Sequence, residues 1–241
     1  MASWITHLRV AENLISQIEG LESSLFAIGN IAPDSGIPDE KWEKFNPPPE
    51  VTHFRVYETT GYLCGDLDFF RRHLLPFRPD GLERGSFSFR LGYFFHLLTD
   101  NLWFKDVYVS TQARFRTQFE ADPDFIWEVK KDWYGLDQRF VRENPDSLYW
   151  RVFLDCGYDR GDLDFIPAEA VRQRIQYIQD YYRSDSAEVR EMLARPFVYL
   201  SQSEMDAFVD RTAARLLRIY RRLWLEGAAL PLGLSALDTV D

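Results

Sequence analysis

The sequence predicts an all-α protein with a single multi-helix domain over residues 1–241. Apolar residues recur at helical spacing through most of the chain after residue 65. Helix-start signals precede several of these segments, the clearest being the capping-box pair Ser201 and Glu204. No βαβ or hairpin pattern is evident. With 241 residues, 46% of them hydrophobic, the chain can form one large core or two small ones.

The N-terminal part is predicted to be one long helix followed by irregular chain. Residues 3–18 carry an apolar stripe at helical spacing, with Ser3 as the N-cap. A short apolar piece over 21–30 leads into a loop over 31–50, where five prolines and a glycine exclude regular structure. Residues 51–62 are expected to be extended or irregular.

The rest of the chain is predicted to be helical almost to its end. One of these helices begins with Asp122 as N-cap and Pro123 at the first helical position. The expected helices cover residues 66–75, 86–104, 105–119, 122–141, 145–154, 167–183 and 201–227.

Composition narrows the class of protein. The net charge of −10 argues against nucleic acid as a partner, because nucleic acids bind basic surfaces. Two cysteines make no disulfide framework, and the N-terminus has no basic segment followed by an apolar core. No run approaches the roughly 20 apolar residues of a membrane-spanning helix. We therefore expect a cytoplasmic protein without a transmembrane segment.

Three of the four histidines occupy unusual positions. His7 lies on the apolar stripe of the first helix, and His53 follows the loop that carries Asp34. His96 and Asp100 are four residues apart in the apolar segment "HLLTD", so both side chains can reach one cation. A buried carboxylate is costly unless it is paired, hydrogen-bonded or bound to a cation. A direct His–Asp hydrogen bond would produce the same spacing.

An acidic ladder lies on the helix predicted after Pro123. Glu128 and Asp132 follow Asp124 at intervals of four residues. Lys130 beside them favours a solvated helix face, whereas the aromatic residues of the same turns favour a site. The sequence leaves both interpretations open.

The order of these motifs resembles the zinc-dependent phospholipase C family, whose all-helical fold is shared with single-strand-specific zinc nucleases. The motifs are a first helix with a histidine, then "GNIAPDSG", "THF" and "FRLGYFFHLLTDNLWFKD", and they cover roughly residues 1–135. Members of that family hold three zinc ions at the base of a cleft. The residues that match the family's ligands are His7, Asp34, His53, His96 and Asp100.

The resemblance also implies further ligands in which carboxylates replace histidines. Asp106 stands where the family has its next histidine, and Glu128 with Asp132 is nearest to a later His-x-x-x-Glu pair. Carboxylate ligands move metal preference from zinc toward manganese, magnesium or iron. We expect two or three ions, with Zn²⁺ first and Mn²⁺ or Fe²⁺ as alternatives. The metal site is assigned to residues 1–145, and no motif assigns a role to the helical part over 146–241.

The resemblance implies a metal-dependent hydrolase, a phosphodiesterase or phospholipase C-like phosphoesterase acting on a small-molecule or lipid substrate. A hydroxide bridging the metal ions would attack phosphorus. Asp34 is the expected catalytic carboxylate, which contacts metal and orients or deprotonates the water. Two other hypotheses stay open. The chain could be a catalytically inactive metal-binding or structural protein on the same fold, or the ionisable groups could form a buried hydrogen-bond network without metal.

Overall fold

The computed structural model describes residues 1–41, 43–58, 61–79, 83–230, 233 and 235–239, and most of these residues are helical, as predicted. Residue 42 of the predicted loop and residues 59–60 of the predicted extended segment lie outside the described residues. Within the described ranges, no helix is both long enough and apolar enough to cross a bilayer.

The helices largely follow the predicted positions. α8 begins at Phe125 with Asp124 as its N-cap, later than expected. The capping box of Ser201 and Glu204 is present at the start of α12. The longer helices are α1 (Trp4–Ile15), α2 (Ser23–Gly29), α5 (Arg84–Trp103), α6 (Val109–Arg114), α7 (Arg116–Ala121), α8 (Phe125–Glu143), α10 (Ala168–Arg183), α11 (Ala187–Ala194) and α12 (Gln202–Tyr220).

Short helical pieces connect them. The four-residue helices are α3 (Pro49–Thr52), α4 (Asp66–Phe69) and α9 (Leu148–Arg151). The 3₁₀ turns are η1 (Ala32–Asp34), η4 (Phe153–Asp155) and η6 (Ala236–Thr239), and the π turns are η2 (Phe70–Leu74), η3 (Phe104–Tyr108) and η5 (Arg221–Leu225). The sequence did not predict α11. Its start depends on one local contact, in which the Ser186 side chain accepts a hydrogen bond from Val189 N.

Two short antiparallel hairpins correct the prediction that the chain has none. β1 (Ile37–Pro38) pairs with β2 (Phe45–Asn46), and β3 (Arg55–Glu58) pairs with β4 (Gly61–Cys64). The end of β4 is held by a tertiary contact. The Asn101 side chain of α5 accepts a hydrogen bond from Cys64 N at 2.8 Å and donates one to Cys64 O at 2.9 Å. A contact between residues so far apart in the chain leaves no local sequence signal.

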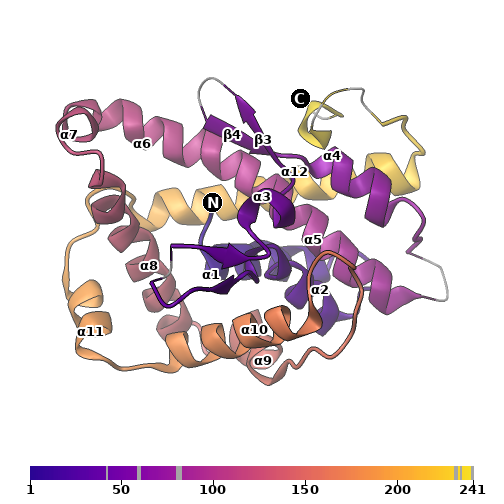
Figure 1. Ribbon diagram of the computed structural model, residues 1–241, viewed down its shortest axis with the longest axis horizontal. Helices are drawn as coiled ribbons and strands as arrows, with labels where there is room; N and C mark the ends of the chain where they lie inside the picture. The colour runs from indigo at the N-terminus through magenta and orange to yellow at the C-terminus, as the bar shows by residue number, and fades with distance from the viewer. Residues whose placement is uncertain (42, 59–60, 80–82, 231–232, 234, 240–241) are drawn as a thin grey trace.

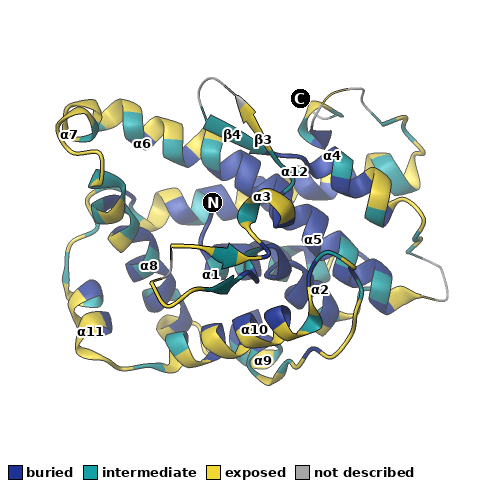
Figure 2. Cartoon of the chain, viewed as in Figure 1, coloured by how far each residue is buried: buried dark blue, intermediate teal, exposed yellow. Residues whose placement is uncertain are grey.

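The core is built around α5, which is buried along almost its whole length (Figures 1 and 2). α2 packs directly against it because glycines stand at the contact. A Cβ on Gly29 would lie 2.1 Å from Phe89 O, and one on Gly92 would lie 2.4 Å from Phe26 O. Only glycine permits so close an approach of two backbones. The contact brings the turn η1 beside the middle of α5.

A buried carboxylate joins the start of α1 to two later helices. Asp137 of α8 accepts hydrogen bonds from Ser3 Oγ at 2.8 Å and from Tyr182 of α10 at 2.7 Å. Burial raises the pKa of Asp137 from its ordinary value of 3.8 to about 7, although both hydrogen bonds act in the opposite direction. α8 and α10 therefore approach the N-terminal turn of α1 from two sides.

We expect Gly92→Ala to destabilise the protein by about 1–3 kcal/mol, because the new Cβ would push α2 away from α5. Alanine's better helix propensity offsets at most about 1 kcal/mol of this loss. Urea unfolding measures the change. Gly157→Ala is the control, since a Cβ there meets no atom within 4 Å. A Gly92→Ala variant as stable as the control would contradict the close packing.

Asp137 also predicts a pH dependence. Its folded-state pKa of about 7 exceeds the ordinary value of 3.8, so the folded protein holds a proton that the unfolded chain releases. Its contribution to stability is complete below about pH 4 and is lost as the pH rises to about 7, a change of up to about 4 kcal/mol. Asp137→Asn should flatten this decline in urea unfolding between pH 5 and 8. The exposed Asp146, changed to Asn, is the control, and an unchanged decline in Asp137→Asn would refute the assignment.

Candidate metal centre

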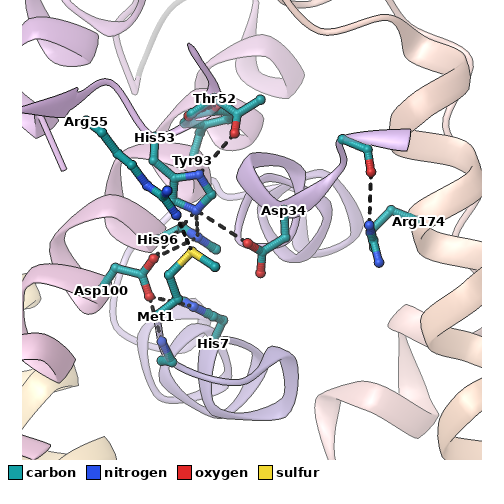
Figure 3. A network of polar contacts seen from close by, with 12 residues as sticks. Met1, His7, Asp34, Thr52, His53, Arg55, Tyr93, His96, Asp100 and Arg174 are labelled. Atoms are coloured by element: carbon teal, nitrogen blue, oxygen red, sulfur yellow. Dashed lines mark hydrogen bonds and ion pairs between the residues drawn. The ribbon is translucent and has the colours of Figure 1, made fainter. Parts of the chain in front are cut away.

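Four parts of the chain bring ionisable side chains to one point inside the protein (Figure 3). α1 supplies His7, and the turn η1 supplies Asp34. His53 follows α3, and α5 supplies both His96 and Asp100. The structure thus assembles the five residues that match the family's ligands.

The donor atoms form two overlapping groups. Within each group one ligand atom per residue lies within 4.8 Å of the others, and the groups are His7 with His96 and Asp100, and Asp34 with His53 and His96. His53 Nε2 lies 3.3 Å from Asp34 Oδ1 and 3.3 Å from His96 Nε2. Asp100 Oδ2 lies 3.5 Å from His96 Nε2 and 3.6 Å from His53 Nε2. Asp100 Oδ1 lies 3.4 Å from His7 Nε2.

These separations fit a shared cation better than direct hydrogen bonds. Hydrogen bonds between a charged nitrogen and a carboxylate are about 2.7–2.9 Å long. Two ligand atoms bonded to one tetrahedral zinc ion at about 2.0–2.1 Å lie about 3.3–3.4 Å apart. Moreover, among the described residues neither ring nitrogen of His7 has a hydrogen-bond partner, and neither does Asp100 Oδ2. Such buried, unpartnered atoms are unfavourable in a hydrogen-bond network without metal.

The outer contacts of the histidines point their Nε2 atoms into the cluster. His96 Nδ1 lies 2.8 Å from the Asn30 carbonyl oxygen, which can only accept, so Nδ1 carries the proton and Nε2 is free to bind metal. His53 Nδ1 lies 3.0 Å from Thr52 Oγ1. Tyr93 in turn donates a hydrogen bond to the Thr52 carbonyl. The His7 ring stacks on His96 with 3.8 Å between centroids, which fixes its plane.

The electrostatics favour the protonation states that a metal requires. Burial lowers the pKa of His7 to about 4, with help from the charge of His96, and burial also lowers the pKa of His53. Burial alone would raise the pKa of Asp34, but the imidazole of His53, 3.3 Å away, and the charge of His96 lower it overall. Burial alone would also raise the pKa of Asp100, but the charges of the N-terminal ammonium and of His96 hold it well below its ordinary value. Neutral imidazoles and ionised carboxylates are the forms that ligate.

His96 is the exception within the cluster. Burial lowers its pKa, but the negative charge of Asp100, whose Oδ2 lies 3.5 Å from His96 Nε2, outweighs burial and raises the pKa overall. Its Nε2 attracts a positive charge at the point where the other donors converge.

The structure does not bring the other three predicted ligands into either group. Asp106 is exposed on η3, because the helix continues past Trp103 and turns this carboxylate outward. Glu128 lies 2.6 Å from Lys131 Nζ and 2.6 Å from an Arg195 nitrogen. Asp132 is buried on another face of α8, where its Oδ2 accepts a hydrogen bond from Tyr199 N at 2.6 Å.

The sequence did not reveal the groups that support the ligands. The Asn30 contact uses a backbone carbonyl, which has no residue-type signal. Thr52 directly precedes His53 in the sequence, which is a weak signal. Its hydroxyl lies near His53 Nδ1 because α3 ends at Thr52. Lys130 favours a solvated helix face in the sequence, one of the two interpretations left open there, and in the structure it is half-buried.

Comparisons of the chain with protein-family models, with curated proteins and with solved structures gave no match. The resemblance to the phospholipase C family therefore rests on the motifs, and the site has to be interpreted from its own geometry.

We expect His96→Ala to abolish metal binding, because Nε2 of His96 belongs to both groups. Its removal should weaken metal affinity by more than the roughly 10–100-fold typical of losing an outer-sphere partner. Elemental analysis of the protein purified without a histidine tag measures the loss. His73→Ala is the matched control, since His73 packs among Phe54, Phe69 and Phe165 outside the cluster. A His96→Ala protein that keeps its metal would overturn this centre.

Proposed function

We propose that the protein is a metal-dependent phosphoric ester hydrolase with phospholipase C-like chemistry. The observation that carries the proposal is the convergence of three imidazoles and two carboxylates at ligand-like separations inside the core. Imidazole and carboxylate sets of this kind are typical of hydrolytic zinc sites. A bound divalent metal would supply a Lewis acid for the phosphoryl oxygens and lower the pKa of water.

The ligand arrangement favours two ions over three. The two groups share His96, whose Nδ1 is occupied by the Asn30 carbonyl, so its Nε2 can serve only one ion. Asp100 directs one oxygen toward His7 and the other toward His53 and His96. Asp100 would therefore be able to offer a ligand oxygen to each of the two groups. Three imidazoles favour Zn²⁺, with Mn²⁺ or Fe²⁺ as alternatives.

Asp34 is the best candidate for a catalytic role. Its side chain is 11% exposed, whereas those of His7, His53, His96 and Asp100 are at most 2% exposed. Asp34 therefore faces the side from which water and substrate approach. Its pKa is also lowered, so the carboxylate stays ionised and can orient the attacking water through its negative charge.

The net charge of the protein and its expected location favour one class of substrate. A net charge of −10 disfavours nucleic acid, so we propose a small-molecule or lipid phosphoester, hydrolysed in the cytoplasm. Arg55 and Tyr62, on the hairpin of β3 and β4, also belong to the surroundings of the cluster. The Arg55 guanidinium lies 4.1 Å from the centroid of the Tyr62 ring.

The test combines metal analysis with turnover of bis(p-nitrophenyl) phosphate, a generic phosphodiester. We expect at least about one equivalent of metal and activity that chelation removes and Zn²⁺, Mn²⁺ or Fe²⁺ restores. Asp34→Asn should lower kcat by about 10²–10³-fold, as expected for loss of a fixed electrostatic contact to the reacting groups. Asp106→Asn is the matched control, since that carboxylate is exposed and outside the cluster.

Two outcomes would contradict the proposal in different ways. Less than about one equivalent of any transition metal would reject a metalloenzyme and favour the buried network. Metal retained without turnover under all three ions would favour a catalytically inactive metal-binding protein.

A further inference from the structure

Arg55 is an arginine of β3 whose backbone is anchored beside the candidate metal centre. It follows the candidate ligand His53 by two residues. Across the hairpin it pairs with Cys64, and the Asn101 side chain holds Cys64 by two hydrogen bonds of 2.8 and 2.9 Å. Asn101 directly follows the candidate ligand Asp100 on α5. The base of the Arg55 side chain is therefore tied to one ligand along the chain and to another through the hairpin.

The Arg55 side chain is directed toward the same centre, as Figure 3 shows. Its Nη2 lies 3.5 Å from Met1 Sδ. The next residue, Ala2, donates its backbone N–H to Asp100 Oδ1 at 2.7 Å. The guanidinium thus contacts the neighbour of a residue that is bonded directly to a candidate ligand. The Arg55 side chain is 12% exposed and that of Asp34 is 11% exposed, so both groups can be reached from solvent.

One edge of the Arg55 guanidinium has no strong acceptor. Among the residues that the structure describes, Arg55 Nε is buried and has no hydrogen-bond partner. Within the same residues, Nη2 contacts the Tyr62 hydroxyl at 3.4 Å and the Met1 sulfur, which is a weak acceptor. An ordinary N–H···O hydrogen bond is about 2.7–3.2 Å long. A buried donor without a good acceptor is unfavourable, so this edge is suited to an additional anionic oxygen.

The other contacts of Arg55 orient the guanidinium without using Nε. Nη1 lies 3.4 Å from Oε1 of the exposed Glu50, an oxygen that also accepts a shorter hydrogen bond of 2.7 Å from the Tyr57 hydroxyl. The guanidinium carbon lies 4.1 Å from the centroid of the Tyr62 ring, and this stacking holds its plane. Glu50 therefore balances the charge from the solvent side, while Nε and Nη2 stay available on the other edge.

We propose that Arg55 is a substrate-binding residue, whose Nε and Nη2 donate to the non-bridging oxygens of the substrate's phosphoryl group. This inference rests on the proposed function and names the cation of its substrate site. Two parallel N–H groups of arginine match the geometry of phosphate oxygens. Charge spreads onto these oxygens during phosphoryl transfer, so a fixed guanidinium stabilises the transition state as well as the bound substrate.

The test measures binding of inorganic phosphate to the metal-loaded protein by titration calorimetry. Arg55→Met keeps an apolar stem and removes the guanidinium, and we expect it to weaken phosphate binding by about tenfold or more while metal content stays unchanged. Arg55→Lys restores the charge without the paired donors, so it should recover only part of the affinity. Arg72→Met is the matched control. It removes an equal charge from a side chain that is 64% exposed and paired with Asp68, and it should bind phosphate like the wild type.

Kinetics give a second readout. Arg55→Met should lower kcat/KM for bis(p-nitrophenyl) phosphate at least as much as it lowers phosphate affinity, because the contact strengthens as charge develops on the oxygens. Arg72→Met should leave kcat/KM unchanged. If Arg55→Met does not fold, Arg55→Gln and Arg55→Lys test the same loss and partial recovery.

The outcomes separate this inference from the proposed function. Equal phosphate affinity in metal-loaded wild type and Arg55→Met would reject the role of Arg55 and leave the hydrolase proposal intact. Equal weakening in Arg55→Met and Arg72→Met would also reject it, since only a general charge effect would remain. Loss of metal together with phosphate binding in Arg55→Met would reject it as well, because Arg55 would then support the ligands. A wild type without metal would reject the hydrolase, and the role of Arg55 would fall with it.

Discussion

The burial of Asp100 in the middle of α5 is the constraint on which the rest of the site depends. Its side chain is 2% exposed and sits in a helix that is buried along almost its whole length, where an uncompensated carboxylate is strongly unfavourable. Three imidazoles surround it at 3.4–3.6 Å, yet its Oδ2 has no hydrogen-bond partner among the described residues. A divalent cation would compensate both the carboxylate and the unpartnered nitrogens at once.

The scaffold serves this cluster by bringing separate segments close to α5. The contact of Gly29 with Gly92 places the Asn30 carbonyl on His96, and it holds the turn that carries Asp34. Asp137 ties the start of α1 to α8 and α10. The same connection therefore fixes the start of the helix that carries His7 against α8 and α10.

The C-terminal helices, to which no motif gave a role, take part in this arrangement. α12 packs along α1, and α10 brings Arg174 beside Gly36 and Trp4. The acidic residues of α8, spaced four apart in the sequence, do not by their spacing show whether their side chains point toward the metal centre. Glu128 forms an exposed ion pair with Lys131, whereas Asp132 is buried and accepts a hydrogen bond from a backbone N–H. Helical spacing gives the relative angles of such residues, and only packing decides which angle points inward.

The sequence by itself determined the helical class and the five residues that converge. Helical periodicity and capping are local properties, and a histidine or carboxylate on an apolar stripe is visible without a structure. Only the tertiary structure decided the hairpin held by Asn101 and the outward direction of Asp106. It also decided that Glu128 and Asp132 turn away from the cluster. Each of these depends on contacts between residues far apart in the chain, whose energies no local pattern records.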